Sequence, residues 1–435
     1  MKVGVATATL VADKEMVIAG GIHPVFVNDQ EGELRATAFV LESHDLQVAI
    51  VSCDILMISQ QDLADPLREI EDTYAIPSSH ILVTCTHTHH APSTVKVHGY
   101  DKDQTFVKRV QRAIVEAVGK AQKNARSSAD DRMMYWLGLE SSVGQNSRLL
   151  LSDGTIYWVG PRDDAIRPTG PFDGELPVLT IADEKGRLKG VLFSHACHNI
   201  GTIKGAVRSP SFYGLAAQEL ESKLGAVAAY LPGAAGSSHN LSLPTQEAVH
   251  RIKSAVKDAL RRAPTIRSEP IQAVKKPFTY RIRHFNDDAE EEQVSYYCTK
   301  RIGKGAEKTI EVFRQMRQSL SSEQGKERTT ELQAMRLGDI ALIALPGEVF
   351  TILGWEIKRR SPFRNTIVVS LANDWIGYLP DEEGFDLGGY QVWTGFHSFV
   401  EKGTGERMVA EAVRLLEELA NPLTQPFSDN DRERS

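Results

Sequence analysis

The stretch ILVTCTHTHHAPS, residues 81–93, joins a run of strand-forming residues to three histidines within four positions. The apolar, β-branched run predicts a buried strand that ends near Cys85. His87 and His89 are two positions apart, and side chains with this spacing on extended backbone point to the same side. We therefore expect these two imidazoles to face one pocket at the end of the strand, and His90 to point elsewhere.

Strand-like and helix-like segments alternate on both sides of this stretch. Hydrophobic patterning predicts buried strands at 46–56, 80–85, 187–197, 226–231, 340–345 and 366–373. It predicts helices at 60–74, 102–124, 212–224, 245–262 and 406–420, and another after the turn at 346–348. An Asp-Gly pair predicts a hairpin turn at 152–158. The alternation predicts an α/β fold, with mixed β-sheets flanked by helices.

The 435 residues are interpreted as one large domain over residues 1–420. Residues 264–330 are more polar and charged than the rest, and we interpret them as an elaboration within that domain, serving as a lid or an oligomer surface. The segment 421–435 is rich in Pro, Ser, Asp and Arg and is predicted to be a flexible C-terminal tail. No internal sequence repeat is visible.

Composition narrows the classes of partner and compartment. A net charge of −7 argues against a nucleic-acid partner. No apolar run approaches transmembrane length, and the N-terminus lacks the pattern of a signal peptide. Cys53, Cys85 and Cys197 lie in apolar, strand-like runs and are interpreted as reduced core thiols. We expect a cytoplasmic protein, with a trimmed secreted protein as the alternative, and a homo-oligomer is compatible with the sequence.

Further candidate ligands follow other predicted strands. His195 and His198 are three apart, so only one of them is expected to join the pocket. Glu348 lies at a strand-to-helix turn, and Tyr390 lies in a glycine-rich loop after the strand at 366–373. Open α/β sheets place their sites at such strand ends. Two imidazoles and a carboxylate are a good ligand set for Zn²⁺, and a catalytic zinc keeps one position open for water.

Several of these stretches resemble one known family. THTHHAP resembles the THTHSGP signature of the neutral/alkaline, non-lysosomal ceramidases. Six other stretches resemble segments of that family in the same order: VGVATATL…GG, GQNSRLLLSDGT, HACHNIGT, LPGAAGSSHN, LPGEVFTILGWEIK and IGYLPDEEGFDLGGYQ. The likeness covers about residues 3–420. It implies the fold of the ceramidase catalytic domain and a Zn²⁺-dependent amide hydrolase.

The resemblance also implies roles for individual residues. It places the zinc ligands on four positions: His87, His198, Glu348 and Tyr390. It implies that His89 handles protons and that Arg148 polarises the substrate carbonyl. The family's GDVSPN loop, which carries a catalytic-site serine, reads GSSHN here, so Ser238, or its neighbour Ser237 or His239, takes that place.

The sequence departs from the family pattern where the pocket wall is expected. The family's SGPG reads HAPS, and the glutamate after the metal tyrosine is Gln391. The immunoglobulin-like C-terminal domain of ceramidases is also expected to be lacking. These departures weaken ceramide as the substrate more than they weaken zinc hydrolysis, so we expect a small-molecule or lipid amide.

The predicted function is therefore cleavage of an amide C–N bond by metal-activated water. Two alternatives remain open from the sequence. One is a binuclear metal hydrolase of the amidohydrolase barrel type, which also carries an HxH motif. The other is a non-catalytic lipid- or carbohydrate-binding relative of the ceramidase fold.

Overall fold

Three four-stranded sheets form the body of the protein in a computed structural model, which describes residues 1–44 and 46–421. The first sheet has strands in the order β1 (Lys2–Thr9), β2 (Arg35–Ser43), β3 (Leu46–Cys53) and β4 (Ile81–Cys85). The second runs from β5 (Arg132–Leu139) through β9 (Glu175–Ala182) and β10 (Leu188–His195) to β11 (Val227–Pro232). The third contains β13 (Ile271–Arg281), β14 (Glu327–Leu337), β15 (Ile340–Ala344) and β17 (Asn365–Val369).

All three sheets are built in the same way. Three antiparallel strands are followed by a fourth that lies parallel to the third. A parallel neighbour needs a crossover connection, and here it contains a helix in each sheet: α1 (Gln60–Tyr74), α3 (Ser211–Leu224) or α7 (Thr351–Arg360). A later helix completes each unit: α2 (Gln104–Arg126), α4 (Thr245–Arg262) or α9 (Thr404–Ala420). One topology is therefore used three times, although the sequence shows no repeat.

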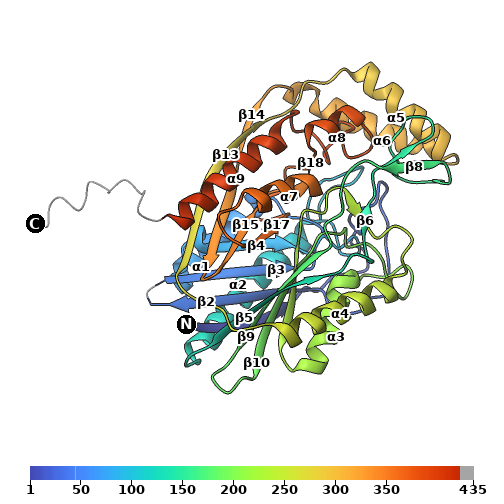
Figure 1. Cartoon of the computed structure of the whole chain (residues 1–435). Helices are drawn as coiled ribbons and strands as arrows, with labels where there is room; N and C mark the ends of the chain where they lie inside the picture. The colour runs from blue at the N-terminus through green and yellow to red at the C-terminus, as the bar shows by residue number, and fades with distance from the viewer. Residues whose placement is uncertain (45, 422–435) are drawn as a thin grey trace, which may run out of the picture.

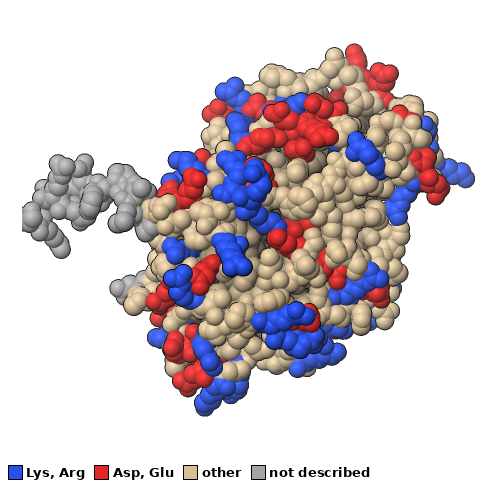
Figure 2. Space-filling model, viewed as in Figure 1, with Lys and Arg blue, Asp and Glu red and all other residues tan. Residues whose placement is uncertain are grey.

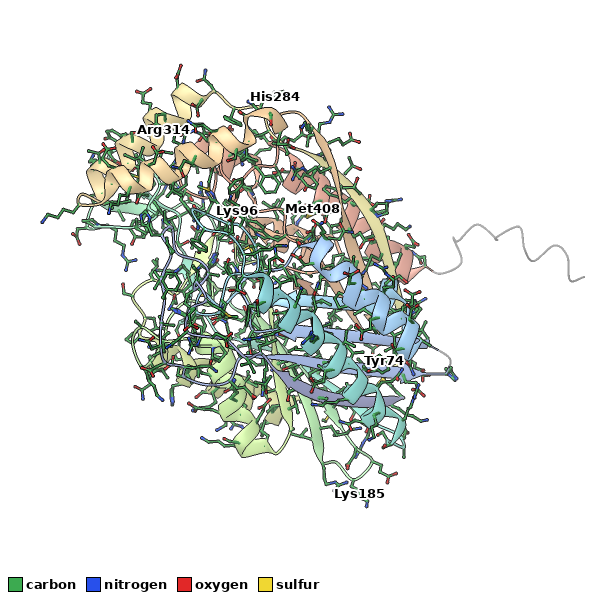
Figure 3. The ribbon with its side chains drawn as sticks, turned by 180° about the vertical axis from the view of Figure 1, so that it is seen from behind. Tyr74, Lys96, Lys185, His284, Arg314 and Met408 are labelled. Carbon is green, nitrogen blue, oxygen red and sulfur yellow. The ribbon has the colours of Figure 1, made fainter. Side chains whose placement is uncertain are left out.

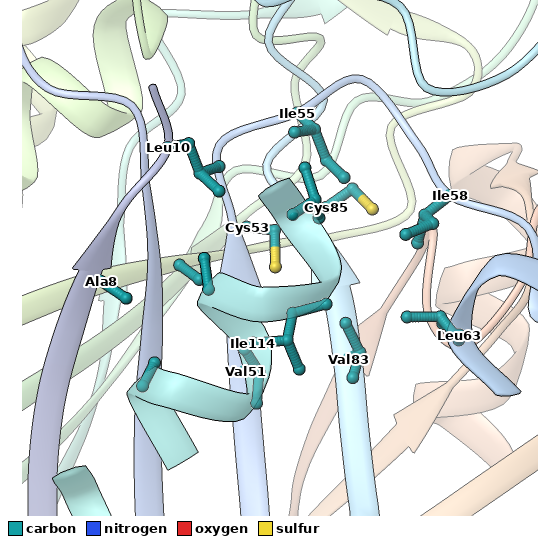
Figure 4. Close-up of a cluster of buried hydrophobic side chains, with 14 of the residues drawn as sticks. Ala8, Leu10, Val51, Cys53, Ile55, Ile58, Leu63, Val83, Cys85 and Ile114 are labelled. Atoms are coloured by element: carbon teal, nitrogen blue, oxygen red, sulfur yellow. The ribbon is translucent and has the colours of Figure 1, made fainter. Parts of the chain in front are cut away.

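The three sheets meet at one shared hydrophobic core. Side chains such as Ile50 from the first sheet, Leu179 from the second and Leu342 from the third pack in one buried cluster. The opposite face of each sheet is covered by its own helix pair, as Figure 1 shows for α7 and α9 on the third sheet. Seen from behind, α1 and α2 lie over the first sheet (Figure 3). Figure 4 shows part of the core beneath them, including Val51, Val83 and Ile114.

Local sequence signals account for several helix limits. Ser59 caps α1 by accepting a hydrogen bond from the backbone N–H of Asp62, and Asp103 caps α2 in the same way through Phe106. The buried side of α2 includes Phe106, Val110, Ile114 and Val118, the apolar series that predicts this helix. The limits of α1 and α4 match the predicted ranges, and the other predicted helices and strands are found within a few residues.

The polar range 264–330 has a more central place than the sequence suggests. Its two outer parts form β13 and β14, which pair along eleven residues in the third sheet. Between them, α5 (Asp287–Arg301) and α6 (Ala306–Leu320) form a helical hairpin, seen at the upper right of Figure 1. This hairpin packs against Leu151, Trp158 and Trp393. Only the hairpin therefore lies outside the three-sheet body.

The predicted hairpin turn at 152–158 is present. The Leu151 N–H donates to the Thr155 carbonyl, the Tyr157 N–H donates to the Leu149 carbonyl, and Leu150 and Ile156 form an antiparallel bridge. Gly154 at the turn has a φ of +82°, which favours glycine. The strand β8 (Ala165–Pro168) also pairs with β7 (Leu149–Leu151), and a loop joins it to the hairpin.

The distribution of surface charge and the state of the cysteines are as the amino-acid composition predicts. Basic and acidic side chains are interspersed on the face shown in Figure 2. All four cysteines are buried and unpaired, which confirms the prediction of core thiols for Cys53, Cys85 and Cys197. Among the described residues, no helix combines the length and hydrophobicity that a membrane span requires. The predicted tail, apart from Asn421, lies outside the described residues.

Truncating a side chain in the shared core should test how much this core contributes to stability. Ile50 is fully buried where the three sheets meet. Ile50→Ala should lower the free energy of unfolding by about 2–5 kcal/mol, because it removes buried methyl groups and leaves a cavity. Ile166→Ala is the matched control, since Ile166 is 64% exposed and its truncation should change stability by less than about 0.5 kcal/mol. Urea denaturation measures both, and equal effects would contradict the shared core.

Candidate metal centre

The candidate site lies where the parallel strand pairs end. The last register partners of these pairs are Cys53–Cys85, His195–Pro232 and Ala344–Val369. The loops that follow carry His87 from the first sheet, His198 from the second and Glu348 from the third. The shared core therefore brings together residues that are far apart in the sequence.

His87 and His198 are held with one ring nitrogen free. The Nδ1 of His87 lies 3.1 Å from the Leu56 carbonyl, and the Nδ1 of His198 lies 2.9 Å from the Ala235 carbonyl and 3.0 Å from that of Ser238. A carbonyl can only accept, so each Nδ1 carries a proton, and Nε2 is the ring nitrogen that faces the pocket. Metal-binding histidines are typically oriented by this kind of hydrogen bond.

The Glu348 carboxylate lies against both free nitrogens. Its Oε2 is 3.3 Å from the Nε2 of His87 and 3.2 Å from the Nε2 of His198. Oε2 is buried and has no hydrogen-bond partner among the described residues, while Trp375 donates to Oε1 at 3.3 Å. Burial raises the pKa of Glu348, but charge attraction and hydrogen bonding with His87 and His198 outweigh it and place that pKa well below the usual value. An ionised oxygen beside two Nε2 atoms needs positive charge between them, which protons or a bound cation can supply.

His89 completes a cluster of three imidazoles. Its Nε2 lies 3.3 Å from the Nε2 of His87, and potential ligand atoms of His87, His89 and His198 all lie within 4.8 Å of one another. The backbone is not extended here, because His87 has a φ of +59°. The two side chains converge as predicted, but a left-handed residue rather than strand alternation aims them.

The close packing around His89 requires a glycine at position 20. A Cβ at Gly20 would lie 2.2 Å from the Nδ1 of His89, and Gly20 has a φ of +93°. Both the space and the backbone conformation therefore exclude a larger residue. Burial, together with the neighbouring His87 and His198, lowers the pKa of His89 well below its ordinary value.

A second tyrosine, which the sequence reasoning missed, lies beside the cluster. The short strand β16 (Glu348–Val349) pairs with β18 (Tyr378–Leu379), and Glu348 and Tyr378 are register partners. The Tyr378 hydroxyl lies 3.1 Å from the Nε2 of His198. Burial first, and then Glu348, raises the pKa of Tyr378 well above its usual value. This long-range pairing leaves no local signal in the sequence.

Tyr390 is near the cluster but is held by other partners. Its ring is stacked between Trp158 and His397, with centroids 4.6 Å away on both sides. His98 donates from Nδ1 to the Gly21 carbonyl, so its Nε2 accepts the Tyr390 hydroxyl proton at 3.0 Å. Tyr390 therefore directs its proton toward His98. The sequence reasoning did not find His98 or Trp158.

The serine loop and the second histidine motif have structural partners. The Ser238 hydroxyl lies 2.8 Å from the hydroxyl of Thr351, whereas the Ser238 carbonyl orients His198. His195 lies apart from the cluster, with its ring nitrogens 2.5 Å from the Tyr213 hydroxyl and 2.7 Å from the Glu140 carbonyl. As expected for residues three apart, only His198 joins the pocket.

Arg148 is buried and binds a loop. Its guanidinium donates to the carbonyls of Gly384 and Gly388 at 2.9 and 2.7 Å, and to the side-chain oxygen of Gln391 at 2.8 Å. Gly384 belongs to α8 (Glu382–Leu387), and the loop continues to Tyr390. Arg148 therefore fixes the segment that carries Tyr390. Burial lowers the pKa of this arginine to about 10.

The cluster opens into a cavity of about 810 Å³. His89, His198, Tyr378 and Tyr390 lie on its wall. The rest of the wall comes from three loops and three single residues. The loops contribute Gly20–Ile22, Tyr157–Asp163, and His239, Leu241 and Ser242, and the single residues are Ser147, Ile200 and Gln391. A small molecule in this cavity can therefore reach the imidazoles and both tyrosine rings.

Fold and site together define an α/β protein with a candidate metal centre at the meeting point of three sheets. The structure is similar to neutral ceramidase from Pseudomonas aeruginosa, with a TM-score of 0.75 and 17% identity over 98% of this chain and 75% of that one. It is equally similar to a ceramidase complexed with C2, with a TM-score of 0.75 and 16% identity over 97% and 75% of the two chains. No family model and no curated protein sequence matches the chain. The protein thus has the ceramidase fold, as the sequence motifs predict.

Replacing Arg148 should separate loop support from direct action on a substrate. Arg148→Met leaves the Gly384 and Gly388 carbonyls without their buried donor. We expect a loss of about 3 kcal/mol in the free energy of unfolding and faster hydrogen exchange across 384–391. Thermal or urea denaturation and exchange mass spectrometry measure the two effects. Unchanged stability and exchange with lost turnover would instead support the role in polarising a carbonyl.

A buried carboxyl beneath the site should give a pH-dependent stability. Asp54, two residues before the Leu56 carbonyl that orients His87, has its pKa raised to about 7 by burial, against the lowering effect of Arg35. Between pH 4 and 7 the unfolded chain releases this proton and the folded chain keeps it, so stability should fall as the pH rises. Asp54→Asn removes this contribution. We expect wild type to lose up to about 4 kcal/mol relative to the variant between pH 4 and 8 in urea denaturation, and parallel curves would contradict the shift.

Proposed function

We propose that this protein is a zinc-dependent hydrolase that cleaves an amide C–N bond with metal-activated water. The observation that carries the proposal is the buried Oε2 of Glu348, which lies within 3.3 Å of two imidazole nitrogens and has no hydrogen-bond partner among the described residues. A divalent cation at this point would give the carboxylate and both Nε2 atoms a common partner. Zn²⁺ suits imidazole and carboxylate ligands better than Ca²⁺ or Mg²⁺, which prefer oxygen.

The proposed ligands are His87, His198 and Glu348, with the hydroxyl of Tyr378 beside them. We favour Tyr378 over the sequence-based choice of Tyr390, because the Tyr378 hydroxyl approaches the Nε2 of His198 while that of Tyr390 is bound to His98. The short pairing of β16 with β18 places Glu348 directly beside Tyr378, because the two are register partners. When bound, the ion would supply Lewis-acid chemistry, polarising a carbonyl and lowering the pKa of water.

We propose His89 as the residue that moves protons. It lies on the cavity wall, 3.3 Å from His87, and none of the described residues fixes its Nδ1 through a carbonyl, in contrast to His87 and His198. Its ring is thus free to accept a proton from one partner and donate it to the departing nitrogen. Only a buried imidazole that is not a ligand can do both.

The other predicted site residues are proposed to position the reacting groups. Ser238 orients His198 through its carbonyl, and Arg148 holds the segment that ends at Tyr390. Tyr390, clamped between Trp158 and His397 with its hydroxyl on His98, is held as a rigid part of the cavity wall. These roles differ from the resemblance-based expectation that Arg148 and Ser238 act on the substrate directly.

The choice of an amide bond rests on the ceramidase likeness, which shows the fold and not the reaction. The ceramidases of similar structure support a C–N bond as the target. The amidohydrolase alternative requires a barrel of eight parallel strands. The described residues form mixed four-stranded sheets instead, so a mononuclear centre is preferred. A reducing, cytoplasmic location and a homo-oligomeric state remain predictions.

Substitutions should separate ligands from the proton-transfer residue. His198→Ala should lose both zinc and turnover, because it removes a ligand nitrogen. His89→Gln should keep one zinc per chain and lower kcat by about 10²- to 10⁴-fold, the usual contribution of general acid–base catalysis. Zinc is counted by inductively coupled plasma mass spectrometry, and turnover is followed on an amide panel with and without chelator.

His195→Asn is the matched control, since His195 lies outside the cluster and should be dispensable for zinc binding. Two zinc ions per wild-type chain would favour the binuclear alternative. Full zinc and full turnover in His198→Ala would refute the ligand set. Zinc binding without chelator-sensitive hydrolysis of any amide would favour a non-catalytic binding protein.

A further inference from the structure

We propose that Arg162, on the cavity wall, binds a carboxylate of the substrate, so that the preferred substrates are amides that carry a carboxylate group. This inference rests on the proposed function and deepens it by naming a substrate class. It arises from the loop between the turn at Gly154 and strand β8, which the ceramidase-like motifs do not cover.

Arg162 has a defined place in the cavity. It lies on the wall together with Tyr157, Ser242 and the imidazoles of His89 and His198. It is the only Lys or Arg on the described wall. A charged group in the cavity therefore meets one cation besides the proposed ion.

The guanidinium is fixed before any ligand arrives. One of its terminal nitrogens donates to the Ser242 hydroxyl, and its central carbon lies 5.5 Å from the centre of the Tyr157 ring. Arginine stacked on an aromatic ring keeps its remaining N–H groups available in a planar fork. Such a preordered donor loses little conformational entropy when it binds an anion.

Arg162 has no carboxylate partner among the described residues. The contrast with a nearby arginine is clear, because Arg301 pairs with both Asp153 and Asp164. The acidic residue on the cavity wall, Asp163, is exposed and forms no ion pair with Arg162. The positive charge is thus left for a ligand.

Arg162 and the candidate metal centre face the same cavity. Arg162, His239 and His198 all lie on its wall, and the ring of His239 is stacked on that of His198, with centroids 5.9 Å apart. One small molecule can therefore place an amide at the imidazoles and a carboxylate at Arg162.

The rest of the wall indicates what joins these two groups. Apolar side chains of Ile22, Trp158, Val159, Ile200 and Leu241 lie between the polar ones. They suit an aliphatic or aromatic substituent. A single guanidinium balances the one negative charge of a carboxylate and forms two parallel hydrogen bonds with it, whereas a phosphate dianion would remain undercompensated. An N-acyl amino acid has all three features.

Paired substrates test this inference on the zinc-loaded full chain. One pair is N-acetylphenylalanine and N-acetylphenethylamine, which differ by a carboxylate on the amine side. The other is N-phenethylsuccinamic acid and N-phenethylbutyramide, which differ by a carboxylate on the acyl side. We expect wild type to show about 10- to 100-fold higher kcat/KM for the acid in one of the pairs, the range of a charge-assisted hydrogen bond.

The variants should change this preference selectively. Arg162→Gln should lower kcat/KM for the acid about 10- to 100-fold more than for the neutral amide and so remove the preference, and Arg162→Lys should retain part of it. Arg167→Gln is the matched control, because Arg167 is exposed, has no ion pair with any described residue and lies outside the cavity. Equal kcat/KM for acid and neutral amides in wild type, or equal losses for both in Arg162→Gln, would overturn the inference.

A binding measurement separates this inference from the proposed function. Calorimetry on the metal-free protein uses both acids, N-acetylphenylalanine and N-phenethylsuccinamic acid. At least one of them should bind about 10-fold more weakly to Arg162→Gln than to wild type and Arg167→Gln. If wild type hydrolyses none of the four amides, the proposed function fails and this comparison decides on Arg162 alone. Equal dissociation constants of the three proteins for both acids would overturn the carboxylate site.

Discussion

The contact of the Glu348 carboxylate with the free nitrogens of His87 and His198 is the interaction on which the site depends. These three groups come from three different sheets, and only the shared core holds them together. The Leu56 carbonyl orients the imidazole of His87, and the Ser238 carbonyl orients that of His198. A buried carboxylate oxygen beside two imidazole nitrogens is unfavourable without a cation or protons between them, so this cluster could hold a metal ion.

Much of the fold could be predicted where local pattern and tertiary burial agree. The helix α2 has one buried side and a capping Asp103, and its range was close to the predicted one. Strands β13 and β14 were hard to delimit in a charged range, because Lys275 and Lys276 lie side by side within β13. Their pairing joins Ile271 to Leu337 across the intervening helical hairpin, and no local signal reports such a long-range contact.

The site could be predicted only in part, for a similar reason. Strand ends pointed to His87, Glu348 and one of His195 and His198, and the ceramidase resemblance selected His198. The structure brings His87, His198 and Glu348 together. The glycine-rich loop drew attention to Tyr390, while Tyr378 reaches the cluster through its register with Glu348. Likewise, the partners of Arg148 are backbone carbonyls of a distant loop, which a sequence motif cannot reveal. Residue type was thus readable from sequence, but hydrogen-bond partners were not.

The separation of the three proposed ligands along the chain has a thermodynamic consequence. His87, His198 and Glu348 are 111 and 150 residues apart, so an ion that joins them cross-links the polypeptide and closes two long loops. The entropic gain from such a clip grows with the length of the loops it closes. A bound ion would therefore act as an inorganic counterpart of a disulfide, in a protein whose cysteines are all left as thiols.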